Sequence, residues 1–378
     1  MSDHRLTRIR IDAALLPERV KWADGLEMSV PSRFACGGLE CGGLDDVAAE
    51  AFANVKDDLR LRAAFTPVAP ALSRLPVSYR AVPSFARHLV AYMIGRIQSQ
   101  RSARWARYPG WPIDLSADLA ADLAGKPGIT FARTPVLLTH DIDSAEGLKN
   151  LVHHFLPVEE EVGARSASYV VPCAWPLDYS LLAEIAQRGH EIGVHGYDHA
   201  NRTPFCDPDA RKRRLTAGRQ FGDRYMAVGY RAPSLLRTPA LLADLAAFYR
   251  YDSSIPTSGG TFPVPNNGCA SARPWRLGVL WEIPVTLPRD GSLRFLGHRP
   301  EAIGRIWRET TQIIVRSGGL VSILTHCERS FSGNAGMLAA YRNFLHWTAG
   351  EPGFEFVRPA DLIARFDLIQ AGADACAI

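Results

Sequence analysis

The stretch HEIGVHGYDH, residues 190–199, holds the pattern from which the fold is predicted. Ile192 and Val194 alternate with other residues, which is typical of a buried strand. A glycine follows His195 and breaks the run, so the polar groups lie at the end of that strand. His195 and His199 are four residues apart, and in a turn or first helical coil this spacing brings two imidazoles to one side.

A second strand-like run lies upstream, VLLTHDID at residues 136–143. It ends in Asp141 and Asp143, which a two-residue period places on the same face of a strand. Divalent metals bind well to two imidazoles and a carboxylate, with a coordination position left for water. We therefore predict Asp143, His195 and His199 as ligands of one divalent ion, with zinc as first choice and cobalt or nickel as alternatives.

From residue 134 onwards, strand-like and helix-like segments alternate, which predicts a mostly parallel sheet or a (β/α) barrel. The predicted strands are 135–138, 167–171, 191–194, 228–230, the strand end at Tyr251, 279–283 and 319–324. The predicted helices are 145–162, 177–188, 207–221, 238–247, 301–317 and 336–348. In such folds the chemistry gathers at the C-terminal ends of the strands. Polar residues follow strand candidates at Asp141, His195, Arg231, Asp252 and His326.

Four of these residues suit catalytic roles around a metal. A bound ion lowers the pKa of its water toward about 7, and Asp141 could then take the proton. Arg231 could hold Asp141 by two parallel hydrogen bonds and keep its pKa low. Asp252 could orient a histidine, and His326 could protonate a leaving amine.

Several of the candidate site residues also have a structural interpretation. Asp141 and Asp143 could cap a helix that begins near Ser144. Arg231 could form a plain ion pair, and a single histidine such as His326 is usually structural. The co-occurrence of the motifs favours the catalytic interpretation.

Composition limits the function classes. The 378-residue chain is 47% hydrophobic and 22% charged, with a formal net charge of +4, values typical of a soluble globular protein. No dense basic block indicates a nucleic-acid partner. We expect no transmembrane segment, because no apolar run approaches about 18 residues, and residues 1–16 lack the apolar run of a secretory signal. The seven scattered cysteines suit reduced thiols, so we expect a cytoplasmic protein.

We expect three parts: an extension at 1–128 packed on the main domain, a catalytic domain at 129–368 and a loose tail at 369–378. In the extension, 8–11 is predicted as a strand, and 44–61 and 117–124 as helices. Cys36 and Cys41 lack a second cysteine pair at ligand spacing, so we interpret them as part of a glycine-rich loop.

One further helix of the extension, around residues 85–107, combines an apolar face with several arginines. Phe85, Leu89, Met93 and Ile97 mark the apolar face. We expect this face to dock on the core, with the arginines in water. Binding to an anionic membrane surface is the alternative.

Together these motifs resemble the polysaccharide deacetylase family, also called the NodB-homology group or carbohydrate esterase family 4. The resemblance covers roughly residues 134–366, and the five motifs occur in family order. THDID at 139–143 resembles the motif that carries the base and a metal ligand, and HGYDH at 195–199 resembles the two-histidine metal motif. RAP at 231–233 resembles the arginine motif that holds the base. Asp252 resembles the acid that tunes the catalytic histidine, and LTH at 324–326 resembles the motif that contains this histidine. The resemblance implies a distorted (β/α) barrel and metal-dependent hydrolysis of an acetamide.

The sequence departs from the family pattern at three places. Ile142 separates the two acids, which resembles the acid-x-acid branch of the family. Ser234 stands where many members have tyrosine, and no tryptophan follows Asp252 at the usual place. The changes at Ser234 and after Asp252 affect the walls that face a sugar more than the metal, so they argue against a polymer substrate.

We therefore expect removal of an N-acetyl or other N-acyl group from an amino sugar or glycoconjugate intermediate. One alternative is a small-molecule amidohydrolase that opens a cyclic amide, ureide or imide. Another is a non-catalytic, metal-dependent glycan-binding protein. The oligomeric state stays open, with a homo-oligomer as one option.

Overall fold

The computed structural model describes residues 19–21, 27–29, 84–102, 115, 118, 128–257 and 271–375. The strand predicted at 8–11, the helix at 44–61, nearly all of the helix at 117–124 and the loop with Cys36 and Cys41 lie outside these residues. Near the N-terminus, β1 (Arg19–Lys21) pairs antiparallel with β2 (Glu27–Ser29).

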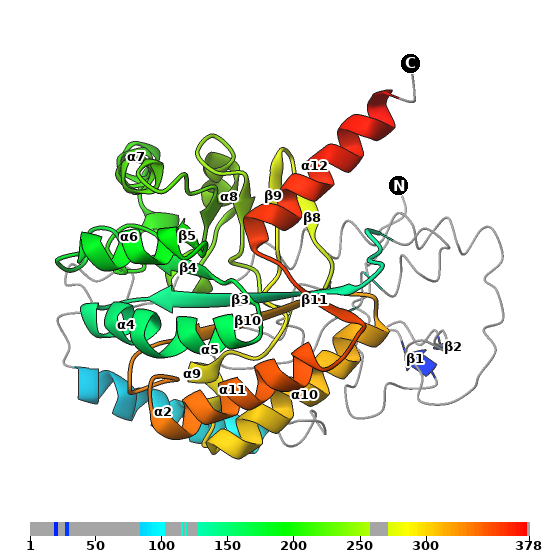
Figure 1. Cartoon of the computed structure of the whole chain (residues 1–378). Helices are drawn as coiled ribbons and strands as arrows, with labels where there is room; N and C mark the ends of the chain where they lie inside the picture. Colours follow the sequence, from blue (N-terminus) through cyan, green and yellow to red (C-terminus); the bar gives the residue numbers. More distant parts are fainter. Residues whose placement is uncertain are drawn as a thin grey trace.

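A nine-stranded sheet dominates the described part of the chain (Figure 1). Its strands are β3 (Thr134–Ile142), β4 (Ala167–Val170), β5 (Glu191–Val194), β6 (Gly229–Tyr230), β7 (Tyr251–Asp252), β8 (Trp275–Leu277), β9 (Leu280–Glu282), β10 (Val321–His326) and β11 (Phe354–Phe356). Their order is β10-β3-β4-β5-β6-β7-β9-β8, with β11 also paired to β3. Neighbours run parallel except β8 and β9. The seven predicted strands are confirmed, although β3 is longer than expected.

The chain after β9 returns to β10, so the sheet curls. Pro256 forms a bridge with Val285, and the backbone N–H groups of Thr286 and Leu287 both donate to the Ser322 carbonyl in β10, at 3.2 and 3.1 Å. Two distant ends of the sheet thus approach each other. This is the distorted (β/α) barrel that the sequence predicts.

Helices connect the parallel strands and cover the sheet. They are α2 (Ser84–Ser102), α4 (Ala145–Asn150), α5 (Leu156–Glu161), α6 (Tyr179–Gln187), α7 (Pro208–Asp223), α8 (Pro239–Leu245), α9 (Asp290–Phe295), α10 (Pro300–Arg316), α11 (Ala335–Ala349) and α12 (Pro359–Ala375). A π-helical segment, Leu151–Phe155, joins α4 to α5, so the helix predicted at 145–162 is continuous but not regular. The other predicted helices are confirmed within a few residues at each end.

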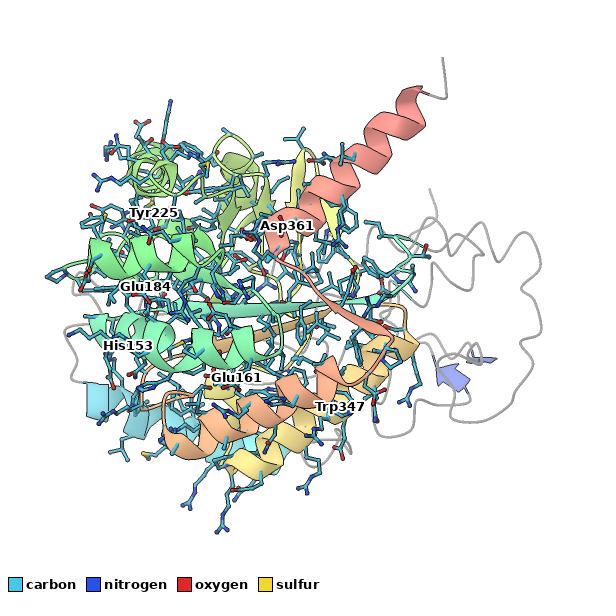
Figure 2. All side chains as sticks on the ribbon, in the orientation of Figure 1. His153, Glu161, Glu184, Tyr225, Trp347 and Asp361 are labelled. Atoms are coloured by element: carbon cyan, nitrogen blue, oxygen red, sulfur yellow. The ribbon has the colours of Figure 1, made fainter. Side chains whose placement is uncertain are left out.

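The helices begin where the sequence offers caps. Asp178, Asp207 and Thr238 accept backbone N–H groups at the starts of α6, α7 and α8, the usual role of such side chains. The inner faces of the helices pack against the sheet and form an apolar core with it. This core includes Trp307 and Phe344, which are both fully buried. Figure 2 shows the side chains on this framework.

Helix α2 docks by a different face from the predicted one. Leu89, Met93 and Ile97 were expected to contact the core, but they are 60%, 61% and 52% exposed. The opposite face packs on α9, where Gly95 lies against the Phe295 backbone. A Cβ at position 95 would clash with the Phe295 carbonyl, so a glycine allows the close approach there.

Two expectations concern the ends and the membrane. Residues 369–375, expected to be loose, form the last part of helix α12. Among the helices that the structure describes, none is long and apolar enough to cross a membrane.

Candidate metal centre and active site

The register of the sheet places the predicted residues at one edge. Asp141 on β3 is paired with His326 on β10. Val194 on β5 is paired with Tyr230 on β6, so His195 and Arg231 follow their strands side by side. The carboxyl ends of parallel strands meet at the same edge, and the described structure brings the predicted side chains together there.

Asp143, His195 and His199 form a compact donor set. Their ligand atoms all lie within 4.8 Å of one another. Asp143 Oδ1 is 3.5 Å from His195 Nε2 and 3.3 Å from His199 Nε2. The histidines meet in an irregular turn rather than a helix, because Gly196 and His199 both have positive φ, 67° and 54°.

These residues fit a divalent ion. Asp143 Oδ1 and His195 Nε2 are buried without a hydrogen-bond partner, which is costly unless another group binds them. His195 Nδ1 donates to the Arg231 carbonyl at 2.9 Å, so its Nε2 lone pair is left for a metal. Burial lowers the pKa of His199, which favours the neutral imidazole that metals bind.

Asp141 lies beside this donor set and is held by Arg231. Arg231 Nη1 donates to Asp141 Oδ1 at 3.1 Å and to Thr139 Oγ1 at 2.9 Å. The expected grip by two parallel bonds is therefore wrong, because the other guanidinium donors bind Ser253.

The charge state of Asp141 follows from its neighbours. Burial raises the pKa of Asp141, but His195, Arg231 and His326 lower it by more, to about 2. Asp141 is therefore an ionised carboxylate that can accept a proton.

His326 is oriented by Asp290, not by Asp252. Asp290 Oδ1 accepts from His326 Nδ1 at 2.8 Å, and Asp290 Oδ2 accepts from the His326 backbone N–H at 2.7 Å. Burial lowers the pKa of His326, but Asp290 raises it by more, to about 10. The ring is therefore an imidazolium at neutral pH, with Nε2 left to act as a proton donor.

Asp252 has another role. Its Oδ1 accepts from Ser254 Oγ at 2.6 Å, and the same Ser254 oxygen accepts from the Ala232 N–H at 2.8 Å. Asp252 thus fixes the turn that follows Arg231. The expectation that it tunes His326 is wrong, because Asp252 lies on β7 and its Oδ1 binds Ser254, two residues further along the chain.

Sequence reasoning missed Asp290. It begins α9, a helix of six residues that was not predicted, and it lies 36 residues before His326. The sequence PRDG at 288–291 contains a signal for this residue. It places an acid shortly after a proline, and the proline follows an apolar strand.

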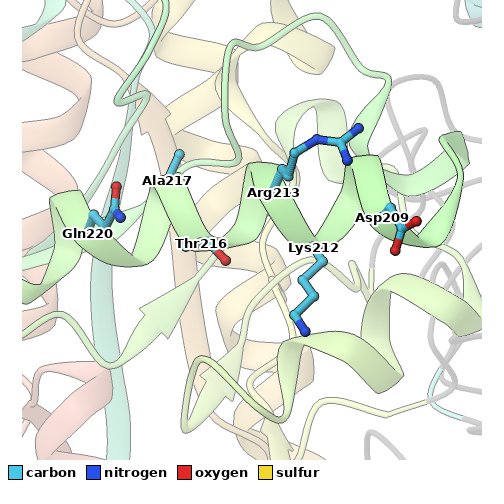
Figure 3. A pocket seen from close by; sticks show the side chains of 6 residues that line it. All are labelled: Asp209, Lys212, Arg213, Thr216, Ala217 and Gln220. Carbon is cyan, nitrogen blue, oxygen red and sulfur yellow. The ribbon is translucent and has the colours of Figure 1, made fainter.

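A shallow hollow on α7 lies apart from this set of residues (Figure 3). Its described lining comes from one helix: Asp209, Lys212, Arg213, Thr216, Ala217 and Gln220. None of the predicted site residues lines it. The candidate active site is therefore the strand edge at β3, β5 and β10.

Comparisons with known proteins agree with this architecture. Residues 129–247 match the family model described as polysaccharide deacetylase. A crystal structure assigned as a polysaccharide deacetylase from Mycobacterium smegmatis is similar with a TM-score of 0.51 and 21% identity, covering 64% of this chain and 93% of that chain. The crystal structure of PuuE allantoinase has a TM-score of 0.50 and 12% identity, covering 64% and 94% of the two chains.

At these identities the two structures show the fold alone. No curated protein matches the sequence. The family model bears out the resemblance, and members of that family are hydrolases of non-peptide carbon–nitrogen bonds. The chain therefore carries a polysaccharide deacetylase domain, matched over residues 129–247.

Proposed function

We propose that this protein is a metal-dependent hydrolase that removes an N-acyl group from an amino sugar or glycoconjugate intermediate. The observation that carries the proposal is the convergence of a three-residue donor set with an ionised carboxylate and a protonated histidine. Asp143, His195 and His199 supply the donors. Asp141 lies beside them, with its Oδ2 at 3.6 Å from His195 Nε2.

The ion held by this donor set would supply Lewis-acid activation of water and of the acyl carbonyl. Zinc suits the donors best, with cobalt or nickel as alternatives. Asp141 accepts the proton of the attacking water, because it is ionised and Arg231 fixes its position. His326 donates a proton from Nε2 to the leaving nitrogen, so the amine departs uncharged.

The turn after Arg231 offers a further donor. Ser234 has a left-handed backbone, with φ 55° and ψ 17°, and its Oγ accepts from Asn201 Nδ2 at 3.1 Å. A backbone N–H near Ser234 would stabilise the negative oxygen that develops on the acyl carbon.

The small Ser234 side chain also bears on the substrate. A wall without the tyrosine found in many family members favours a compact substrate over a polymer. The opening of a cyclic amide, ureide or imide uses the same groups, so it is the second candidate. A cytoplasmic enzyme would meet such small substrates, and the free thiols of Cys173, Cys206 and Cys327 support that location.

The test uses the zinc-loaded full chain and its Asp141→Asn variant. We expect wild-type protein to release acetate from N-acetylated amino sugars. The variant should lose turnover by at least about 100-fold, because a general base contributes about 10²- to 10⁴-fold. Elemental analysis should find the same metal content in both, since Asp141 is not a ligand.

Three outcomes would overturn the proposal. One is retained turnover in the Asp141→Asn variant, which would remove Asp141 as the base. Another is turnover of cyclic amides only, which would favour the second candidate. The third is ligand binding without any product, which would point to a glycan-binding protein.

A further inference from the structure

Arg289 is a buried arginine that uses little of its hydrogen-bonding capacity. The residue is only 7% exposed. Its one hydrogen bond to a described residue runs from Nη2 to Ser292 Oγ at 3.3 Å, long for a charged donor. Its Nε has no acceptor, and no described carboxylate forms an ion pair with it. A guanidinium has five N–H donors, and burying them unpaired is costly.

Arg231 shows how this protein normally buries an arginine. Arg231 is fully buried. Its guanidinium donates to Ser253, Thr139 and Asp141 and lies over the Tyr169 ring at 4.1 Å. Arg289 lacks a comparable set of partners among the described residues. Its unused donors are therefore available to a group from outside the chain.

Arg289 lies close to the residues of the candidate active site, as its neighbour in the sequence and its electrostatic interaction with Asp141 indicate. It directly precedes Asp290 in the sequence, which holds the catalytic His326. Asp290 already accepts from the His326 ring, the His326 backbone and Ser332, so it does not serve as the partner of Arg289. Burial lowers the pKa of Arg289 to about 10. Among the groups that raise this pKa, the carboxylate of Asp141 has the largest effect. Arg289 is thus charged and within electrostatic reach of the base.

The charge balance of the described site favours an anionic ligand. Arg231, Arg289 and protonated His326 stand against the carboxylates of Asp141, Asp143 and Asp290. A divalent ion on the donor set adds two positive charges.

We propose that Arg289 binds a carboxylate or phosphate group of the substrate, so the substrate is an anionic N-acyl compound. This inference rests on the proposed function and narrows its substrate class. The arginine fork matches both anions through two parallel hydrogen bonds. A neutral N-acetyl sugar would leave these donors unused.

The experiment compares three substrates of the zinc-loaded full chain. They are N-acetylglucosamine, its 6-phosphate and N-acetylmuramic acid, which are neutral, phosphorylated and carboxylated. For wild type, we expect kcat/KM to be at least about tenfold higher on one anionic substrate, the effect of one good charge-assisted hydrogen bond. Arg289→Gln should remove this preference through KM, because it should lower kcat/KM on that anionic substrate by at least about tenfold more than on the neutral substrate. Arg289→Lys, which keeps the charge, should restore part of it.

The matched control is Arg294→Gln on α9, the helix that Arg289 directly precedes, because Arg294 donates to Tyr92 in the contact with α2. It should leave the preference intact. Two results would overturn the inference: a wild type without preference, or an Arg289→Gln variant equally impaired on all three substrates. The second result would mean that Arg289 only balances the charge of Asp141.

A binding measurement separates this inference from the proposed function. Calorimetry with inorganic phosphate and with acetate is carried out on zinc-loaded wild type and Arg289→Gln. Binding of either anion at least about tenfold weaker in the variant supports the anion site, even if no N-acyl sugar is cleaved. Equal binding of both anions contradicts the anion site, whatever the outcome of the activity screen.

Discussion

Two histidine–carboxylate pairs lie at the ends of the adjacent strands β3 and β10, and they differ in what their rings have left to offer. His140 is fully buried, with Nδ1 bonded to Thr325 Oγ1 at 2.8 Å and Nε2 to Glu159 Oε1 at 2.7 Å. His326 is bonded to Asp290 through Nδ1 only. A histidine with both ring nitrogens engaged can hold the fold, whereas a histidine with one free nitrogen can also transfer a proton.

The direction of the side chains explains this division. His140 and Asp141 are successive residues of β3, so they point to opposite faces of the sheet. Asp141 faces the site, and His140 faces the helices, where its ring contacts Phe155 and Tyr341. One strand thus faces the candidate active site on one side and the core on the other.

The largest expected effect on kcat comes from a change in the proposed catalytic pair, Asp290 and His326. Asp290→Asn removes the charge that raises the pKa of His326, so kcat should fall by about 100-fold. Activity that needs the imidazolium is present below the pKa of His326 and is lost above it. The alkaline limb of the pH profile should therefore move to lower pH in the variant. Steady-state kinetics between neutral and alkaline pH would measure both changes.

Asp209→Asn provides the control for this variant, since Asp209 also stands in the first turn of a helix but lies on α7. It should leave kcat and the pH profile unchanged. If Asp290→Asn lowered kcat without moving the alkaline limb, Asp290 would only support the shape of the loop.

Mutation of the structural pair, His140 and Glu159, should lower the stability of the protein rather than its activity. Glu159 also accepts a hydrogen bond from Tyr341 at 2.9 Å and lies 3.6 Å from His190. Glu159→Gln breaks a fully buried pair, so the free energy of unfolding should fall by about 3 kcal/mol. The kcat of the folded, metal-loaded fraction should stay within about twofold of wild type, because the reacting groups lie on the other face. Denaturant unfolding and kinetics measure the two quantities.

The neighbouring Glu160 offers a matched control. Its side chain is 29% exposed and pairs with Arg188, so Glu160→Gln should cost less than about 1 kcal/mol. A comparable loss in both variants would show that burial does not separate them. A large drop in kcat for Glu159→Gln would show that the two faces of β3 are coupled.

The contrast also explains what the sequence could predict. Asp143, His195 and His199 lie in two short motifs, each at the end of one apolar strand, so local spacing was enough to find them. Asp290 was missed because its contact with His326 depends on how a short helix returns to β10. The wrong assignment of Asp252 has the same cause: a strand-end acid is visible in the sequence, but its partner is not.

Helix α2 illustrates a second limit. Its apolar spacing predicted the helix but not the docking face, since Leu89 and Met93 are exposed while Gly95 makes the close contact. The backbone of α9 determines which face of α2 docks, and hydrophobic periodicity carries no information about that backbone.

Removal of a single hydroxyl from the structural pair should give the smallest effect. Tyr341→Phe keeps the buried ring beside Phe155 and removes the O–H that donates to Glu159 Oε1. Because a hydrogen bond to a charged group contributes about 1.5 to 3 kcal/mol, the free energy of unfolding should fall by about 1.5 kcal/mol, without a change in kcat. In a double variant with Glu159→Gln, the total loss in free energy of unfolding should be smaller than the sum of the two single losses, since both changes affect the same contact. Additive losses in denaturant unfolding would instead mean that the Tyr341 hydroxyl stabilises the fold independently of Glu159, and that the pair on β3 consists of His140 and Glu159 alone.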